Sequence, residues 1–170
     1  MRTFAEERKS GTIEALLTAP LSPSSVVLAK FGAVLSTYAL MWAPTVLYVV
    51  ILRKTGGVDW HSVATSYLGL LGVGATYLAA GTLMSSLTKS QLVALLLTIL
   101  FVFGLFVMGI GEYVFEDGLL RDLCAHVSMA SQMEDFSRGI IDLRRVVFDL
   151  SSVSLCLFLT TRVVDSWRWS

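Results

Sequence analysis

Three long stretches of the chain carry no Asp, Glu, Lys or Arg. They cover residues 31–52, 60–88 and 90–111, and they are 22, 29 and 22 residues long. At a rise of ~1.5 Å per residue, a 22-residue helix extends about 33 Å, enough to cross the ~30 Å hydrocarbon core of a membrane. Lipid offers the backbone no hydrogen-bond partner, and the stretches lack the alternation of barrel strands. The pattern therefore predicts three membrane-spanning α-helices.

A fourth span is predicted over residues 146–161, near the end of the chain. This stretch is short, but Arg144 and Arg145 before it and Arg162 after it can extend their charged ends toward the membrane surface. It also contains Asp149, four residues after Arg145. We expect Asp149 to lie near the membrane interface in an ion pair with Arg145. The alternative role for this carboxylate is in a proton relay.

Helix-breaking residues and apolar spacing divide the chain further. Pro44 lies inside the first uncharged stretch and predicts a kink there. Residues 112–145 contain two runs with helical apolar spacing, which predict an outer segment of two amphipathic helices joined near Ser131. The predicted domains are a surface segment, 1–30, and a membrane domain, 31–170, with spans at about 31–52, 63–87, 91–111 and 146–161.

Composition supports the same class of protein. Hydrophobic residues make up 55% of the chain and charged residues only 15%, whereas a soluble domain is about 25% charged. The 13 basic and 13 acidic residues cancel, so no global field favours nucleic acid as a partner. The two cysteines cannot form a disulfide framework, and His61 and His126 have no neighbours in sequence suited to a metal site. We therefore predict an all-α, polytopic transmembrane helix bundle without catalytic or metal-binding residues.

The first thirty residues carry a more specific pattern. An amphipathic helix is expected before Gly11, which fits a helix C-terminus, and Thr12 can cap a second helix that ends at Pro20. Ser22 followed by Pro23 is a further N-cap signal, and it opens the helix that becomes the first span. Taken alone, this leading helix–turn–helix segment is consistent with an interfacial lipid anchor or with a docking surface for a cytosolic partner.

This leading segment resembles the cytosolic coupling helix of type-2 ABC exporter permeases, most closely the branch of gliding-motility and nitrous-oxide-reductase accessory permeases. A second, shorter match precedes the last span and includes the chain end. The residues that carry the resemblance are Met1, Arg2, Phe4, Ala5, Glu6, Glu7, Arg8, Gly11, Thr12, Ile13, Glu14, Leu16, Leu17, Thr18, Pro20, Leu21 and Lys30, then Phe136, Arg138, Gly139, Ile140, Ile141, Asp142, Leu143, Arg144, Arg168 and Trp169.

The resemblance implies an architecture and a location. Permeases of this family have six spans, a coupling helix between the second and third, and re-entrant helices outside between the fifth and sixth. The four predicted spans correspond to spans three to six, and residues 112–145 to the re-entrant element. Both ends of this chain are then cytosolic, and the protein is a multi-pass protein of a bacterial plasma (inner) membrane. The first two family spans are missing, so we expect a truncated chain or a misplaced start.

The resemblance also implies how the protein obtains energy. The sequence contains no G-x-x-x-x-G-K-[ST] phosphate loop, so we expect it not to be an enzyme, and its spans are expected to offer hydroxyl groups rather than buried charges. The implied partners are a cytosolic ABC ATPase, which holds the ATP and magnesium, a second permease copy in a homodimer or heterodimer, and the lipid bilayer. The residues expected to contact the ATPase are Glu6, Glu7, Arg8, Gly11, Thr12, Glu14, Leu17 and Pro20.

Small residues in the second span predict close helix packing. Ala75 and Ala79 are four residues apart, as are Gly81 and Ser85, and this spacing lets another helix approach closely, within the bundle or across a dimer. The predicted function is the membrane-spanning permease subunit of an ABC-type exporter for an unidentified solute. The alternatives are a non-transporting membrane anchor or assembly factor and an inactive, truncated permease fragment.

Overall fold

The computed structural model describes residues 4–5, 22–57, 59–116 and 118–167, apart from the side chain of Thr55. Within these residues the regular structure is helical, with no strand. Seven helices follow one another in this part of the chain: α3 (Pro23–Trp42), α4 (Thr45–Thr55), α5 (Trp60–Leu87), α6 (Gln91–Val114), α7 (Leu119–Val127), α8 (Met129–Ser137) and α9 (Leu143–Ser166).

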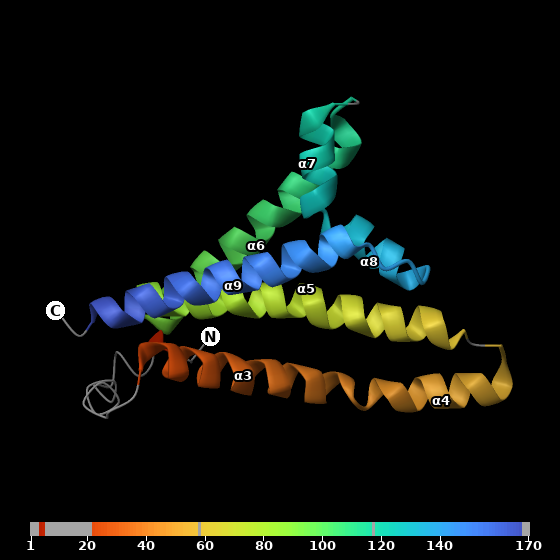
Figure 1. Ribbon diagram of the computed structural model, residues 1–170, viewed down its shortest axis with the longest axis horizontal. Coiled ribbons are helices and arrows are strands. Elements are labelled where there is room, and N and C mark those ends of the chain that lie inside the picture. The colour runs from red at the N-terminus through yellow and green to blue at the C-terminus, as the bar shows by residue number, and fades with distance from the viewer. Residues whose placement is uncertain (1–3, 6–21, 58, 117, 168–170) are drawn as a thin grey trace.

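Four helical segments are long and apolar enough to cross a membrane. They are α5, α6, α9 and the stretch Pro23–Lys54, which comprises α3 and most of α4. The predicted all-α bundle with four spans is therefore confirmed. Figure 1 shows α5 and α9 side by side, with α3 and α4 along one side of them. Helix α6 diverges from this layer, and α7 folds back against α6.

Polar side chains cap the starts of α3, α5 and α9. Ser22 accepts a hydrogen bond from the backbone N–H of Ser25 and precedes Pro23, as the sequence predicts for the start of α3. Asp59 caps α5, and Asp142 caps α9. Because hydrogen bonds from the Ser62 hydroxyl and from the His61 backbone favour the charged form, the pKa of Asp59 is lowered.

The predicted kink at Pro44 is present as an interruption between α3 and α4. Pro44 has no N–H, so it cannot complete the hydrogen-bond ladder of the helix. The hydroxyl of Thr45 donates instead to the carbonyl of Trp42 at 2.6 Å and lies 2.6 Å from the hydroxyl of Tyr67 on α5. The carbonyl of Leu40, which an N–H at position 44 would bond in a regular helix, accepts instead from the N–H of Ala43 at 3.2 Å.

Helix α5 forms the centre of the bundle, and its glycines let three neighbouring helices approach. A Cβ atom at Gly69 would lie 2.4 Å from the ring of Phe136 on α8, and one at Gly74 would lie 2.4 Å from the ring of Tyr38 on α3. At Gly72, the nearest atom would be a carboxylate oxygen of Asp149 on α9, at 2.8 Å. Large side chains of the neighbours therefore fill space that α5 leaves free.

The segment between α6 and α9 forms the two expected short helices, but their junction differs from the prediction. The break lies at Ser128, not near Ser131, because the Ser128 side chain caps α8 by accepting the backbone N–H of Ser131. Helix α8 packs along α5 and fills the space next to its first half, before the start of α9 (Figure 1). Gly139, at a φ of 82°, makes the turn that leads on to α9, a conformation that strongly favours glycine.

Candidate functional site

Phe4 is buried at the end of the bundle where α3 begins and α9 ends. Its side chain is only 1% exposed and packs against Val27 of α3 and Val164 of α9. The ring of Trp167 meets it edge to face at a centroid distance of 6.0 Å, and the Lys30 ammonium lies 4.4 Å from its centroid. A buried aromatic ring with a cation over its face is a strong local attachment.

Ser85 of α5 completes this attachment through the backbone. Its hydroxyl oxygen accepts hydrogen bonds from the N–H groups of Phe4 and Ala5, both at 3.1 Å, and its side chain is fully buried. Ala5 is helical, and the first N–H groups of a helix have no acceptor within it. Ser85 therefore acts as an N-cap supplied by another helix. We name Phe4, Val27, Ser85, Val164 and Trp167 the Phe4 anchor.

The Phe4 anchor connects the leading segment with three of the four candidate spans. The contacts come from α3, α5 and α9, so a movement of Phe4 acts on all three helices at once. Close-packed interiors transmit strain because they have little free volume to absorb it. Beside the anchor, a cleft of about 530 Å³ is lined by Ala5 and residues 88–93 of the α5–α6 connection.

The predicted coupling residues lie outside the residues that the structure describes. Of the leading motif, Phe4 and Ala5 are described, and both are buried. In the sequence, these two residues belong to the motif that carries the resemblance and to the first expected amphipathic helix. The coupling residues whose contacts stay a prediction are Glu6, Glu7, Arg8, Gly11, Thr12, Glu14, Leu17 and Pro20.

The four small residues chosen for helix packing face the inside of this single chain. Ala79, Gly81 and Ser85 are buried, and Ala75 is half-buried beside a cleft between α3, α5 and α9. Ser85 serves the leading segment through the two backbone hydrogen bonds described above. A contact of these residues across a dimer stays a prediction.

A second site, which is polar, lies at the middle of the bundle and joins Asp149 to Gly72, Thr76 and Gln132, three residues that no sequence pattern singles out. Asp149 is 5% exposed and accepts a 2.6 Å hydrogen bond from the side-chain amide of Gln132 on α8. Its other oxygen lies 3.4 Å from the hydroxyl of Thr76 on α5, and Gly72 leaves the space that the carboxylate occupies. We name Gly72, Thr76, Gln132 and Asp149 the Asp149 cluster.

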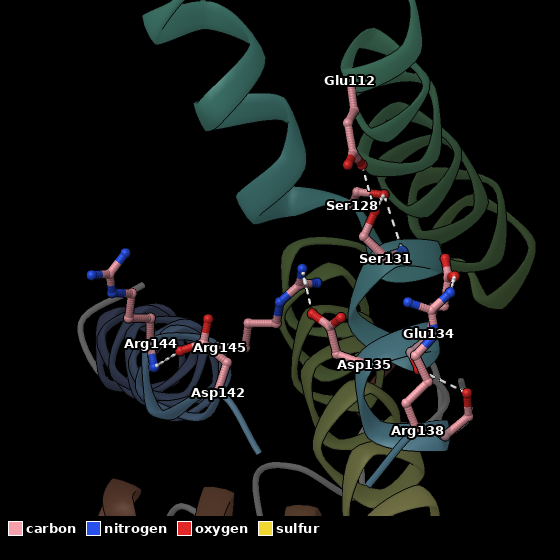
Figure 2. A network of polar contacts seen from close by, with 10 residues as sticks. Glu112, Ser128, Ser131, Glu134, Asp135, Arg138, Asp142, Arg144 and Arg145 are labelled. Carbon is pink, nitrogen blue, oxygen red and sulfur yellow. Dashed lines mark hydrogen bonds and ion pairs between the residues drawn. The ribbon is translucent and has the colours of Figure 1, made fainter. Parts of the chain in front are cut away.

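The expected ion pair between Asp149 and Arg145 is wrong. Arg145 reaches from α9 to α8, where its guanidinium pairs with Asp135 at 2.8 Å (Figure 2). Its Nη1 atom is buried and has no hydrogen-bond partner in the described part of the chain. Arg145 and Asp149 thus have different partners on neighbouring helices, although their spacing of four residues on α9 permits an ion pair.

Asp149 lies level with the middle of α5, and its expected position near the membrane interface stays a prediction. It lies against Gly72 and Thr76, which are 12 and 16 residues after the start of α5 at Trp60. At ~1.5 Å per residue, this level is about 18–24 Å along a helix about 42 Å long. The spans therefore offer a buried carboxylate as well as hydroxyl groups. The signal in the sequence was Asp149 itself, because it interrupts the last apolar run.

Charged and polar side chains on the outer segment hold α8 in place. The hydroxyl of Ser131 donates to the carboxylate of Glu112 at the end of α6, and Arg138 pairs with Glu134 within α8 (Figure 2). With the Arg145–Asp135 pair, these contacts tie α8 to both α6 and α9. Gln132 is thereby fixed in a position from which it reaches Asp149.

Comparison with known proteins identifies one family. A family model described as "ABC-2 family transporter protein" matches residues 1–123 of the chain. No curated protein and no solved structure matches the chain. The matched region contains the leading segment and the helices α3 to α6, whereas α8 and α9, with Gln132 and Asp149, follow it.

Proposed function

Because the chain belongs to the ABC-2 family of transporter proteins, it is a multi-pass membrane permease component of an ABC transporter, and we propose that a cytosolic ABC ATPase drives it by gripping its leading segment. The permease is not itself the catalytic component of such a transporter. In this proposal the ATPase holds the ATP and magnesium and passes its closure to the spans.

The single observation that carries this proposal is the Phe4 anchor. A leading segment that merely lay on the lipid surface would not need a buried aromatic ring and a cap from α5. Here the described part of that segment is fixed to α3, α5 and α9 together. A pull or push on the following residues, among them Leu17, would reach these spans through Phe4.

The remaining features of the proposal follow the resemblance of the sequence. Two permease copies, identical or different, pair with the ATPase in a bacterial inner membrane, with both ends of this chain in the cytosol. The direction of transport is export, and the accessory-permease branch is the one whose motifs the chain resembles. The solute is left open, because neither the anchor nor the family identifies it.

Co-purification with the cognate ABC ATPase tests the proposal. Leu17→Asp is expected to weaken the complex by at least about tenfold, because a charge replaces the apolar anchor of the interface. A matched control is Leu119→Asp, which places the same charge at a 77% exposed position of α7. That variant should keep the ATPase bound.

The rate of ATP hydrolysis separates a permease from a passive membrane anchor. The wild-type complex should change the hydrolysis rate of its ATPase, and a passive anchor should bind without changing it. Undiminished binding by Leu17→Asp would refute the proposed grip. If the wild-type chain neither binds the ATPase nor affects its rate, the proposed function is wrong.

A further inference from the structure

Asp149 has hydrogen-bond donors around it, but no cation forms a direct ion pair with it in the described part of the chain; Arg145 acts on it only from a distance. Among the residues that the structure describes, no Lys, Arg or His nitrogen forms an ion pair with its carboxylate, since Arg145, one turn earlier, is paired with Asp135. The donors present are the amide of Gln132 and the hydroxyl of Thr76, which are both neutral. A buried carboxylate without a directly paired counter-ion is costly, and either a proton or a positively charged partner relieves that cost.

The carboxylate also keeps capacity to accept further hydrogen bonds or a charge. The single hydroxyl proton of Thr76 is shared between the carbonyl of Gly72, at 3.2 Å, and Asp149, at 3.4 Å. Both distances are long for a hydroxyl donor. A carboxylate has about four acceptor sites, and here the short Gln132 bond fills one of them.

An apolar cleft of about 380 Å³ borders Asp149. It lies between α3, α5 and α9, and Asp149 forms part of its wall. Its other walls are largely hydrocarbon and aromatic. They include Phe31, Leu35, Leu68, Ala75 and Val153.

We propose that this cleft binds hydrophobic monocations, with Asp149 as their counter-ion. The apolar walls suit the hydrocarbon part of such a ligand, and the carboxylate suits its single charge. An anion would be repelled, and a divalent metal would lack ligands, because no group of three His, Cys, Asp or Glu side chains gathers within the described ranges. This binding site does not depend on the proposed ATPase, so either proposal can fail alone.

The distribution of charge near the cleft favours a cation over a neutral lipid chain. A lipid chain would fill the apolar walls but would leave Asp149 uncompensated. A ligand whose positive charge lies next to the carboxylate gains an attraction that a neutral ligand of the same shape lacks, and we expect the difference in affinity to be at least about tenfold. The carboxylate should therefore decide which ligands bind.

Binding of tetraphenylphosphonium to the full chain in lipid nanodiscs tests the proposal. Radiolabelled tetraphenylphosphonium is measured by equilibrium dialysis, as the excess over protein-free nanodiscs. Asp149→Asn should weaken this binding at least about tenfold. The matched control Asp165→Asn removes the same charge from the same helix, about 24 Å from Asp149 along the axis of α9, and should bind as the wild type does.

Two further measurements keep the test decisive if Asp149→Asn folds poorly. Tetraphenylborate has the same shape with the opposite charge and should not displace the cation. Ala75→Leu narrows the cleft and keeps the carboxylate, so it should weaken binding as well. Equal binding of tetraphenylphosphonium by wild type, Asp149→Asn and Ala75→Leu, or no excess over empty nanodiscs, would overturn the proposal.

Discussion

The Phe4 anchor and the Asp149 cluster both join α5 to α9, yet they are built from opposite chemistry. The anchor is aromatic and apolar, and its polar contacts are backbone N–H groups capped by Ser85. The cluster centres on a charge that only neutral side chains satisfy. An apolar contact of fixed shape is suited to passing on movement, whereas an unbalanced charge is suited to holding a ligand. The two proposals therefore assign different tasks to two levels of the same pair of helices.

Replacing Phe4 by Ala is the strongest way to break the anchor. Removing a buried aromatic side chain costs ~3–5 kcal/mol where the structure cannot collapse around the cavity. We expect Phe4→Ala to bind the ATPase nearly as well as wild type but to lose most of its effect on the hydrolysis rate. The residues that contact the ATPase are unchanged in this variant, whereas the contacts of Phe4 with the spans are lost. Binding and hydrolysis are measured on the same purified complex.

The conservative variant Phe4→Leu is the control for this experiment. Leucine fills most of the volume between Val27 and Val164, so it should restore most of the stimulation. Full stimulation by Phe4→Ala would show that the anchor does not transmit movement. The Asp149 cluster should be unaffected in both variants. Each should therefore bind tetraphenylphosphonium as tightly as the wild type does.

Gly72→Ala disturbs the Asp149 cluster and leaves the Phe4 anchor intact. The new Cβ atom would lie 2.8 Å from a carboxylate oxygen of Asp149, so one of the two must move. Overpacking of this kind costs ~1–3 kcal/mol. We expect a lower midpoint of thermal unfolding in detergent.

Gly104→Ala provides the matched control on α6. A Cβ atom there meets nothing within 4 Å, so the substitution should be neutral or stabilise the helix by about 0.5–1 kcal/mol. If both alanine variants unfold at the same temperature, the close approach of Asp149 to α5 is not present in the protein.

The local features of the chain could be predicted from the sequence, whereas the contacts that build the anchor and the cluster could not. Uncharged stretches, Pro44 and the Ser22–Pro23 start are local signals, and the structure confirms the four spans and these features. Phe4 likewise belongs to a dense local motif. The hydrogen bond from the Phe4 N–H to the Ser85 hydroxyl could not be predicted, however, because 81 residues separate the two.

The Asp149 cluster joins α5, α8 and α9, and no spacing rule links their residues. The spacing of Arg145 and Asp149 even suggested a wrong partner, since it describes one helix and ignores Asp135 on the neighbour. The level at which Asp149 meets α5 could not be predicted either, because it depends on how α9 packs along α5.

Ser85→Ala should have the smallest effect, and it separates the two parts of the anchor. The variant leaves the Phe4 ring in place but removes the acceptor of the Phe4 and Ala5 N–H groups. Losing a cap costs ~1 kcal/mol, which corresponds to about fivefold faster amide exchange at these two positions if local opening limits the rate.

Hydrogen exchange followed by mass spectrometry measures this difference in the leading peptide, and Ser36→Ala is its control. The hydroxyl of Ser36 is exposed and bonds within its own helix, to the carbonyl of Ala33, so its loss should leave the leading peptide unchanged. Unchanged exchange in Ser85→Ala would assign the attachment to the aromatic ring alone. Faster exchange with preserved ATPase stimulation would mean that the ring transmits movement and the cap only fixes the register of the segment on α5.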